Sequence, residues 1–254
     1  MRIVLTLMLM VVVAQARAQF SSSTAFAVAP QLLVTNQHAV ADCGSIEVIA
    51  ADGRRAGSVV DADARIDLAL LRVTGLEGAT ARLRNPRTVR LGEPVTIFGF
   101  PLAGELSSSG NFTSGLVSAL QGVRDAAGEL QITAPIQRGN SGGPVMDASG
   151  LVIGVVQYKL DALKSAQAGG DLPQNVNFAI SLDVLAAFLA MNNVPFQANL
   201  RSAPLDTAKV AELAQGFTYR VECRGPALQT KGAEQARRET EAKVEAAKKA
   251  EQVR

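Results

Sequence analysis

The sequence contains little of several residue types on which whole classes of protein depend. Its 254 residues include no tryptophan, one histidine and two cysteines, and the basic side chains exceed the acidic ones by only two. So small a positive excess gives no indication of nucleic-acid binding. Cys43 and Cys223 also lie too far apart in the chain to form a metal-binding motif. We therefore expect no metal, no cofactor and no nucleic-acid partner.

Long apolar runs are absent too, apart from a short run near the start of the chain. Residues 3–14 are mostly apolar, follow Arg2 and precede Ala16-Arg17-Ala18. The run is shorter than the roughly 20 residues that span a bilayer. This pattern predicts a secretory signal peptide over residues 1–18 rather than a membrane anchor. The mature protein would then be periplasmic or secreted, with no membrane attachment after cleavage.

Such a location is oxidising, and this bears on the two cysteines. Both Cys43 and Cys223 lie in the mature part of the chain. Disulfides form and persist in extracytoplasmic compartments. We expect a bond between these two residues, and the alternative is two separate thiols.

Short apolar segments separated by turn signals make up most of the chain. One set, including "SIEVIA" and "LALLRV", lies between residues 24 and 73, and a second set, including "LVIGVVQY", lies between residues 94 and 181. Such segments are typical of an all-β sandwich or barrel, here in two successive units. The polar stretch "RNPRTVRLGEP" separates them. We predict an N-terminal β-barrel over residues 19–90 and a C-terminal β-barrel over residues 91–195.

Helical signals come late in the chain. Ser181 can cap the apolar stretch "LDVLAAFLAMN", which should form a helix on the second barrel. Residues 196–224 are expected to be an extension that packs on the core and includes a strand carrying Cys223. Residues 225–254 are rich in alanine, glutamate, lysine and arginine. We expect this charged tail to be a frayed helix or disordered, with a partner-binding coiled coil as the alternative.

The stretch "RGNSGGPVMD" places Ser141 among three glycines and before Pro144, where regular structure gains nothing. A surface turn is the ordinary explanation, and a nucleophile on a strained loop is the other. A serine needs a base to take its proton. The single histidine, His38 in "TNQHAV", can supply that base, and Asp67 in "IDLALLRV" can orient its ring. The chain order is His38, Asp67, Ser141.

These three segments resemble the motifs of chymotrypsin-fold serine peptidases, and among them the bacterial HtrA/Deg-like group. "NVNFAIS" resembles the segment that follows the nucleophile in that group, and the resemblance covers residues 22–193. It implies two six-stranded antiparallel β-barrels with the active site between them, and peptide-bond hydrolysis through an acyl-enzyme. His38 corresponds to the general base, Asp67 to its orienting carboxylate and Ser141 to the nucleophile.

The resemblance also implies an oxyanion hole and a substrate site. Backbone N–H groups of Gly139 and Ser141, with Asn140 between them in the turn, would bind the developing negative charge. Pro135 aligns with the floor of the primary pocket and carries no charge, so we expect a preference for small or medium apolar residues over Arg or Lys. Residues 155–157, which are Val155, Val156 and Gln157, should pair with the substrate backbone as an added strand.

Two departures from the family pattern bear on regulation. The chain after residue 193 is too short for the PDZ domain that many HtrA-like proteins carry, so we expect none. Some relatives are activated when a freed N-terminus forms a salt bridge with an aspartate just before the nucleophile. This chain has Asn140 at that position, so we expect it not to be activated in this way.

The sequence supports three hypotheses. The first is a serine endopeptidase that acts on protein or peptide substrates. The second is a catalytically idle peptide-binding module that keeps the fold. In the third, the charged tail makes this an interaction or anchoring protein. No feature indicates a particular oligomeric state.

Overall fold

The computed structural model describes residues 20–85, 87–102, 108–159, 174–200 and 203–225. The predicted signal peptide and nearly all of the charged tail lie outside these ranges, so the expectations about them stay predictions. Within the described ranges, no helix combines the length and the apolar character needed to cross a membrane.

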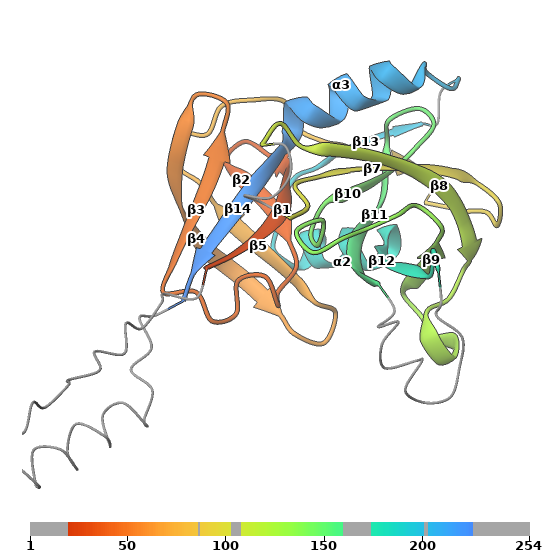
Figure 1. Cartoon of the computed structure of the whole chain (residues 1–254), viewed down its shortest axis with the longest axis horizontal. Coiled ribbons are helices and arrows are strands. Elements are labelled where there is room, and N and C mark those ends of the chain that lie inside the picture. Colours follow the sequence, from red (N-terminus) through yellow and green to blue (C-terminus); the bar gives the residue numbers. More distant parts are fainter. Residues whose placement is uncertain (1–19, 86, 103–107, 160–173, 201–202, 226–254) are drawn as a thin grey trace, which may run out of the picture. The chain divides into compact units, whose positions relative to one another are not determined.

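The first of two barrels contains six strands, all paired antiparallel (Figure 1). Around the barrel their order is β1-β14-β3-β4-β5-β2. The strands are β1 (Phe20–Ala29), β2 (Leu32–Thr35), β3 (Ser45–Ala50), β4 (Gly53–Asp63), β5 (Leu68–Arg72) and β14 (Thr218–Arg224). The alternation that predicted β3 places Ile46 and Val48 in the barrel interior. The hairpin from β3 to β4 turns at Ala51-Asp52. Gly53, the first residue of β4, has a φ of +140°, a backbone conformation that L side chains rarely adopt.

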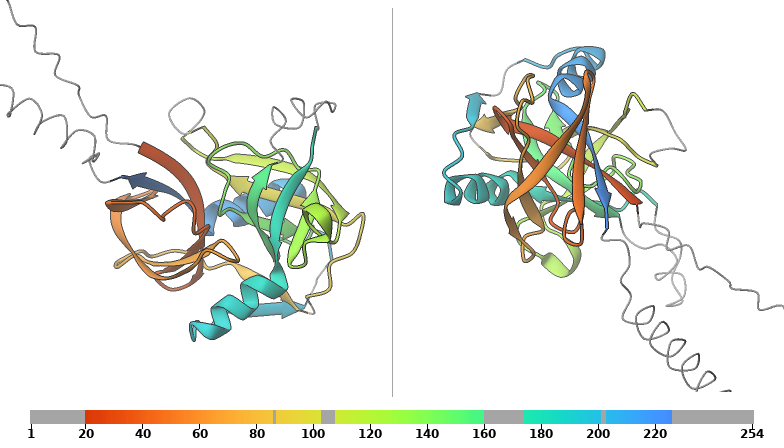
Figure 2. Two further views of the ribbon diagram at one scale, coloured as in Figure 1. Left: turned by 90° about the horizontal axis from the view of Figure 1, so that it is seen from below. Right: turned by 90° about the vertical axis from the view of Figure 1, so that its left-hand side faces the viewer.

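The second barrel also contains six antiparallel strands, in the order β10-β7-β8-β9-β12-β11, and pairing between β10 and β11 closes it. The strands are β7 (Pro94–Gly99), β8 (Asn111–Ala119), β9 (Glu129–Ile132), β10 (Pro144–Asp147), β11 (Val152–Lys159) and β12 (Asn177–Ser181). β6 (Arg82–Asn85) adds to β11 in parallel, and β13 (Gln197–Leu200) adds to β6. The left view of Figure 2 shows the two barrels side by side. The predicted all-β fold with two six-stranded barrels is confirmed.

The strand pairings differ from the predicted domain limits at two places. β14 comes from the expected C-terminal extension, yet it is inserted between β1 and β3 and closes the first barrel. β6 lies within the predicted N-terminal barrel but belongs to the sheet of the second. Residues 19–90 alone therefore do not complete a barrel. The reason is that strand partners are chosen by edge pairing across long sequence separations, which local turn signals do not encode.

Among the residues that the structure describes, two α-helices and one 3₁₀ turn, η1 (Val123–Asp125), accompany the strands. α2 (Leu182–Met191) begins after Ser181 as predicted, although the Ser181 side chain makes no capping hydrogen bond. The buried side chains of α2, such as Leu185 and Phe188, pack on the second barrel beside β11 and β12. α3 (Thr207–Phe217) is capped by Asp206 and contacts β14 of one barrel and β7 of the other.

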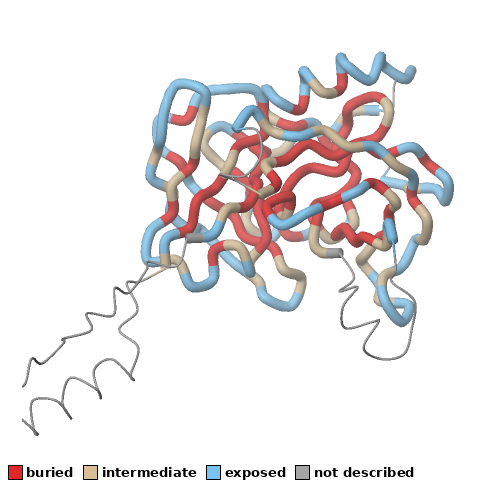
Figure 3. The backbone as a smooth tube through the Cα atoms, in the orientation of Figure 1, coloured by how far each residue is buried: buried red, intermediate tan, exposed pale blue. Residues whose placement is uncertain are grey.

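One hydrophobic cluster crosses between the barrels. It joins Phe26 and Leu68 of the first barrel to Phe98 and Met146 of the second, and all four side chains are buried. Figure 3 shows this continuous buried interior along the backbone. Because apolar side chains from both barrels leave water together, their contact fixes the relative position of the two barrels.

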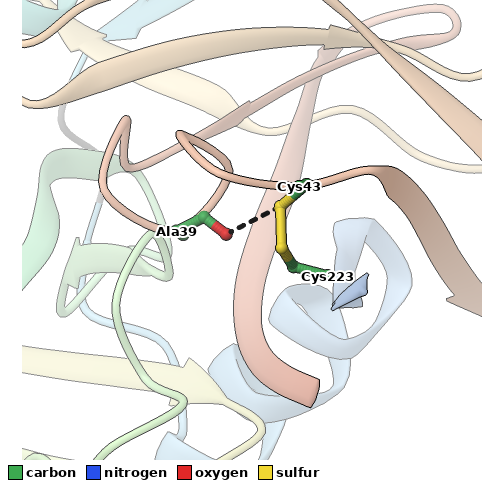
Figure 4. The surroundings of a disulfide bond; sticks show 3 residues. All are labelled: Ala39, Cys43 and Cys223. Atoms are coloured by element: carbon green, nitrogen blue, oxygen red, sulfur yellow. Dashed lines mark hydrogen bonds between the residues drawn. A yellow bond between two sulfur atoms is a disulfide. The ribbon is translucent and has the colours of Figure 1, made fainter. Parts of the chain in front are cut away.

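The predicted disulfide is present and joins two distant parts of the first barrel. Cys43, in the segment between β2 and β3, is bonded to Cys223 on β14, with the two Cα atoms 5.3 Å apart (Figure 4). The sequence separation is 180 residues. The bond therefore ties the closing strand of the barrel to the segment that follows His38.

Removal of this disulfide is expected to lower the free energy of unfolding by about 2–4 kcal/mol, because the unfolded chain loses a long-range constraint. Denaturant titration of the double variant Cys43→Ala/Cys223→Ala measures the change. As a control, a reducing agent should destabilise the wild type and leave the double variant unchanged. Equal stability of variant and oxidised wild type would contradict the prediction.

Candidate active site

His38 and Asp67 meet at the ends of two paired strands. β2 and β5 are antiparallel with Thr35 opposite Ala69, so His38 just after β2 lies near Asp67 just before β5. His38 Nδ1 lies 2.8 Å from Asp67 Oδ2 and 3.0 Å from Oδ1. The histidine side chain is 52% exposed and the aspartate side chain 16%. A shielded carboxylate thus holds a ring that remains open to solvent.

Asp67 is held in place by its own backbone and by the segment before His38. Its φ is +55°, an uncommon value for a non-glycine residue. Its carbonyl oxygen accepts hydrogen bonds from the side-chain amide of Asn36 at 3.0 Å and from the N–H of Gln37 at 3.2 Å. The carboxylate Oδ1 also accepts the backbone N–H of His38 at 3.0 Å. These bonds orient the carboxylate toward Nδ1 of the histidine.

Ser141 lies on the segment between β9 and β10, and its neighbouring glycines are required sterically. Gly139 and Gly142 have φ values of +101° and +84°. A Cβ at Gly142 would overlap the backbone carbonyl of Thr24, and one at Gly139 would overlap that of Phe100. Glycine is therefore the residue that fits both positions. The segment from Arg138 to Gly143 is called the nucleophile loop below.

Two hydrogen bonds set the direction of the N–H groups predicted to form an oxyanion hole. The carbonyl of Arg138, in the same peptide group as the Gly139 N–H, accepts the N–H of Leu102 at 2.8 Å. The carbonyl of Asn140, in the same peptide group as the Ser141 N–H, accepts the N–H of Gly143 at 2.9 Å. Across the described ranges, the N–H groups of Gly139 and Ser141 themselves have no hydrogen-bond partner. Both donors are therefore available to a ligand.

Asn140 is buried between these two donors. Its N–H donates to the Gln137 carbonyl at 3.0 Å, and its Oδ1 accepts the Gln137 N–H at 3.2 Å. These bonds form the turn. Its N–H is consequently not available as a third donor.

The hydroxyl of Ser141 donates to the backbone carbonyl of Gln157 at 3.1 Å. Considering only residues that the structure describes, no hydrogen bond joins Ser141 to His38. The loop nevertheless packs beside the His38 segment, because a Cβ at Gly142 would lie 3.0 Å from the backbone nitrogen of Asn36. In unliganded enzymes such hydrogen bonds are often incomplete.

The three residues expected to pair with substrate differ in their surroundings. Val155 and Val156 are fully buried. The N–H and carbonyl of Val156 are already bonded, to Gly143 at 2.8 Å and Gly142 at 2.9 Å. Gln157 falls at an irregularity in the pairing of β11 with β12, and its carbonyl accepts the hydroxyl of Ser141. Bulges of this kind often occur next to active sites.

Two further residues flank the site. Pro135 is exposed in the segment that leads from β9 to the nucleophile loop, and its carbonyl accepts the hydroxyl of Thr113 at 3.0 Å. Tyr158 follows the irregularity, stacks on Phe178 with ring centroids 4.9 Å apart and donates to Glu129. Burial, together with the nearby Glu129 carboxylate, raises the pKa of Tyr158 to about 12, so the phenol stays neutral at neutral pH.

Sequence reasoning missed Thr24, which contacts the nucleophile loop from the first barrel. It follows three serines in β1 and begins the buried stretch "TAFAV", in which it is the polar residue. The neighbouring Ser23 is buried as well, so the sequence gives no local signal that separates Thr24 from it.

Comparison with known proteins relates the chain to peptidases. A family model of the trypsin-like peptidase domain matches residues 23–155. An uncharacterised protein of Sinorhizobium fredii, y4bJ, is 45% identical over 81% of this chain and 33% of its own length. Human serine protease HTRA4 is 33% identical over 63% of this chain and 32% of its own length. The chain thus spans about a third of the length of these curated relatives.

Two solved structures have the same fold. The HtrA-type protease AlgW, solved with a decapeptide, is 25% identical and aligns with a TM-score of 0.56 over 66% of this chain and 50% of its own. A serine endoprotease from Yersinia pestis, 24% identical, aligns with a TM-score of 0.52 over 70% of this chain and 65% of its own. With the family match, these findings bear out the resemblance to HtrA-like proteins, and the chain belongs to the family with a trypsin-like peptidase domain.

Proposed function

We propose that the protein is a serine endopeptidase in which His38, Asp67 and Ser141 form the catalytic triad. The observation that carries the proposal is the 2.8 Å contact between His38 Nδ1 and the shielded Asp67 carboxylate. This contact leaves Nε2, the other ring nitrogen, free to act as a base. The nucleophile loop beside it offers two unpaired N–H groups and a serine hydroxyl. Family membership supports the same activity.

The reaction follows from these positions. Ser141 Oγ attacks the scissile carbonyl while its proton passes to His38 Nε2, and the Asp67 carboxylate stabilises the resulting imidazolium. The carbonyl oxygen becomes negative and accepts hydrogen bonds from the N–H groups of Gly139 and Ser141. His38 then gives its proton to the departing amine, which leaves an acyl group on Ser141. Water activated by His38 hydrolyses this ester and restores the serine.

Before the attack, the Ser141 hydroxyl must leave the carbonyl of Gln157. A peptide substrate bound as an added strand brings backbone N–H groups to this part of the site. One of them can take over the Gln157 carbonyl, which frees the hydroxyl for His38. We therefore assign the backbone contact with substrate to Gln157, since the polar groups of Val156 are used within the loop.

Substrate preference and location are parts of the same proposal. The uncharged Pro135 supports small or medium apolar residues before the scissile bond, and cleavage after Arg at an equal rate in a peptide library would contradict this. The disulfide between Cys43 and Cys223 supports a periplasmic or secreted protein.

A catalytically idle peptide-binding module is the second candidate. The observation in its favour is that Ser141 Oγ donates to Gln157 rather than to His38. In that case the cleft would bind peptides without cleaving them.

A fluorophosphonate probe separates the two candidates, because it reacts only with a serine whose hydroxyl a base has activated. We expect wild-type protein to be labelled at Ser141, and Ser141→Ala and His38→Ala to lose the label. Ser108→Ala, which removes an exposed serine, serves as the control and should label like wild type. Mass spectrometry of the labelled peptide identifies the site. Absence of labelling in folded wild type would reject the endopeptidase and favour the binding module.

A further inference from the structure

Thr24 is a fully buried residue of β1 in the first barrel, yet most of its hydrogen bonds go to the second barrel. The placement follows from strand pairing. β2 pairs with β1 only from Phe26 onward, so the preceding part of that edge of β1 is not covered by β2. The nucleophile loop occupies this place beside Thr24. An edge of one barrel thus supports the loop of the other.

Thr24 forms four hydrogen bonds. Its hydroxyl donates to the carbonyl of Gly139 at 2.6 Å and accepts the N–H of Phe100 at 3.0 Å. Its own N–H donates to the carbonyl of Ser141 at 2.9 Å. Its carbonyl accepts the hydroxyl of Thr35 at 2.7 Å. One residue therefore binds the carbonyl groups of both residues that carry the oxyanion-binding N–H groups.

Of these four bonds, the one from the Thr24 hydroxyl to the Gly139 carbonyl has the largest effect on the loop, because glycine is conformationally free. Gly139 has no side chain to restrict rotation, and its φ of +101° lies where other residues are disfavoured. The direction of its N–H is therefore set by the hydrogen bonds on either side, one at Arg138 and one from Thr24 to the Gly139 carbonyl. Without the Thr24 hydroxyl, the peptide group after Gly139 keeps only the bond from the Asn140 N–H to the Gln137 carbonyl, so Gly139 is less constrained.

We propose that Thr24 is a positioning residue that holds the oxyanion-binding loop in its working conformation across the interface of the two barrels. The inference rests on the proposed function of Ser141 as nucleophile. Thr24 does not touch substrate; it acts through Gly139, and its hydroxyl is the group responsible. Loss of the hydroxyl should weaken binding of the transition state more than binding of the substrate.

The kinetic test replaces Thr24 by valine, which keeps the shape of the side chain and removes the hydroxyl. Because loss of one oxyanion donor costs about 10²–10³ in rate, partial disorder of such a donor should lower kcat by about 10–100-fold with little change in KM. Thr24→Ser restores the hydroxyl and should recover most of the activity. Affinity for a peptide boronic acid, which places an oxygen in the oxyanion position, should fall in parallel with kcat/KM.

A matched control separates positioning from general destabilisation. Ser149→Ala also removes a buried hydroxyl, one that donates to Asp147 at 2.8 Å away from the nucleophile loop. It should lower the Tm comparably and leave kcat unchanged. If Ser149→Ala and Thr24→Val lose activity to the same extent, or if Thr24→Val keeps wild-type kcat, the inference is overturned.

Hydrogen–deuterium exchange of residues 137–143 gives a readout that does not depend on activity. We expect faster exchange in Thr24→Val than in wild type, Thr24→Ser or Ser149→Ala. Faster exchange with unchanged kcat would show a structural role only and reject the inference. If wild type lacks fluorophosphonate labelling while exchange still responds to Thr24→Val, the proposed function has failed and the support of the loop by Thr24 stands. Unchanged exchange rejects that support directly.

Discussion

Asp67→Asn is expected to lower kcat by about 10⁴-fold at neutral pH, the size of effect seen when a triad carboxylate becomes an amide. The physical reason is the tautomer of His38. An asparagine amide at this position presents an N–H to Nδ1, which must then accept a hydrogen bond and leaves the proton on Nε2. A protonated Nε2 cannot take the proton of Ser141. The kcat for a chromogenic peptide, measured between pH 6 and pH 9, tests this.

A nearby aspartate provides the control for this prediction. Asp63 ends β4 and pairs with exposed Arg65 rather than with His38. Asp63→Asn removes the same charge, from a side chain as shielded as that of Asp67, at 17% exposed. It should change kcat by less than about twofold, since a pair formed with a solvent-exposed arginine contributes little. If Asp67→Asn retains more than a tenth of wild-type activity while remaining folded, His38 is not oriented as proposed.

Arg84→Met is expected to lower the free energy of unfolding by about 3–5 kcal/mol, because removing one partner of a buried ion pair leaves the other charge uncompensated. Arg84 on β6 is 2% exposed, and its Nη1 binds the carboxylates of Glu93 and Asp147, which are 4% and 0% exposed. Its Nη2 binds the carbonyl of Thr88. The variant would leave two buried carboxylates without their shared cation. Urea denaturation followed by circular dichroism measures the loss.

Arg82→Met is the matched control, because Arg82 lies on the same strand but is exposed. A surface change of this kind should alter stability by no more than about 0.5 kcal/mol. Equal destabilisation by the two variants would indicate that strand β6 itself, and not the buried cluster, is sensitive to substitution.

This cluster also marks a place where the sequence was misleading. The polar stretch around Pro86 was predicted to be the junction between two domains, and polar junctions are normally solvated. Arg84 and Glu93 in that stretch are buried instead. Their burial is possible because Asp147, from the end of β10, approaches from a distant part of the chain. No pattern of neighbouring residues in the sequence predicts such a distant partner.

The residues of the candidate site were easier to predict from the sequence than the order of the strands. The glycines around Ser141 indicated from the sequence that the backbone there is unusual. Gly139 and Gly142 indeed adopt backbone conformations that only glycine adopts readily. The single histidine and an aspartate before an apolar strand completed the set of residues. Their side-chain chemistry, together with the family resemblance, was enough to predict that His38 and Asp67 lie together.

The sequence by itself determined the local properties of this protein: which segments are extended, which face of each strand is buried, where the chain turns, and which side chains carry chemistry. These follow from backbone preferences and from the period of apolar residues, and both are properties of neighbouring positions. Only the tertiary structure decided that β14 closes the first barrel, that Thr24 supports a loop of the second and that Gln157 holds the Ser141 hydroxyl. Those contacts join residues that are remote in sequence. Strands pair and barrels pack along whole surfaces, so the partners of each residue depend on all of these contacts together.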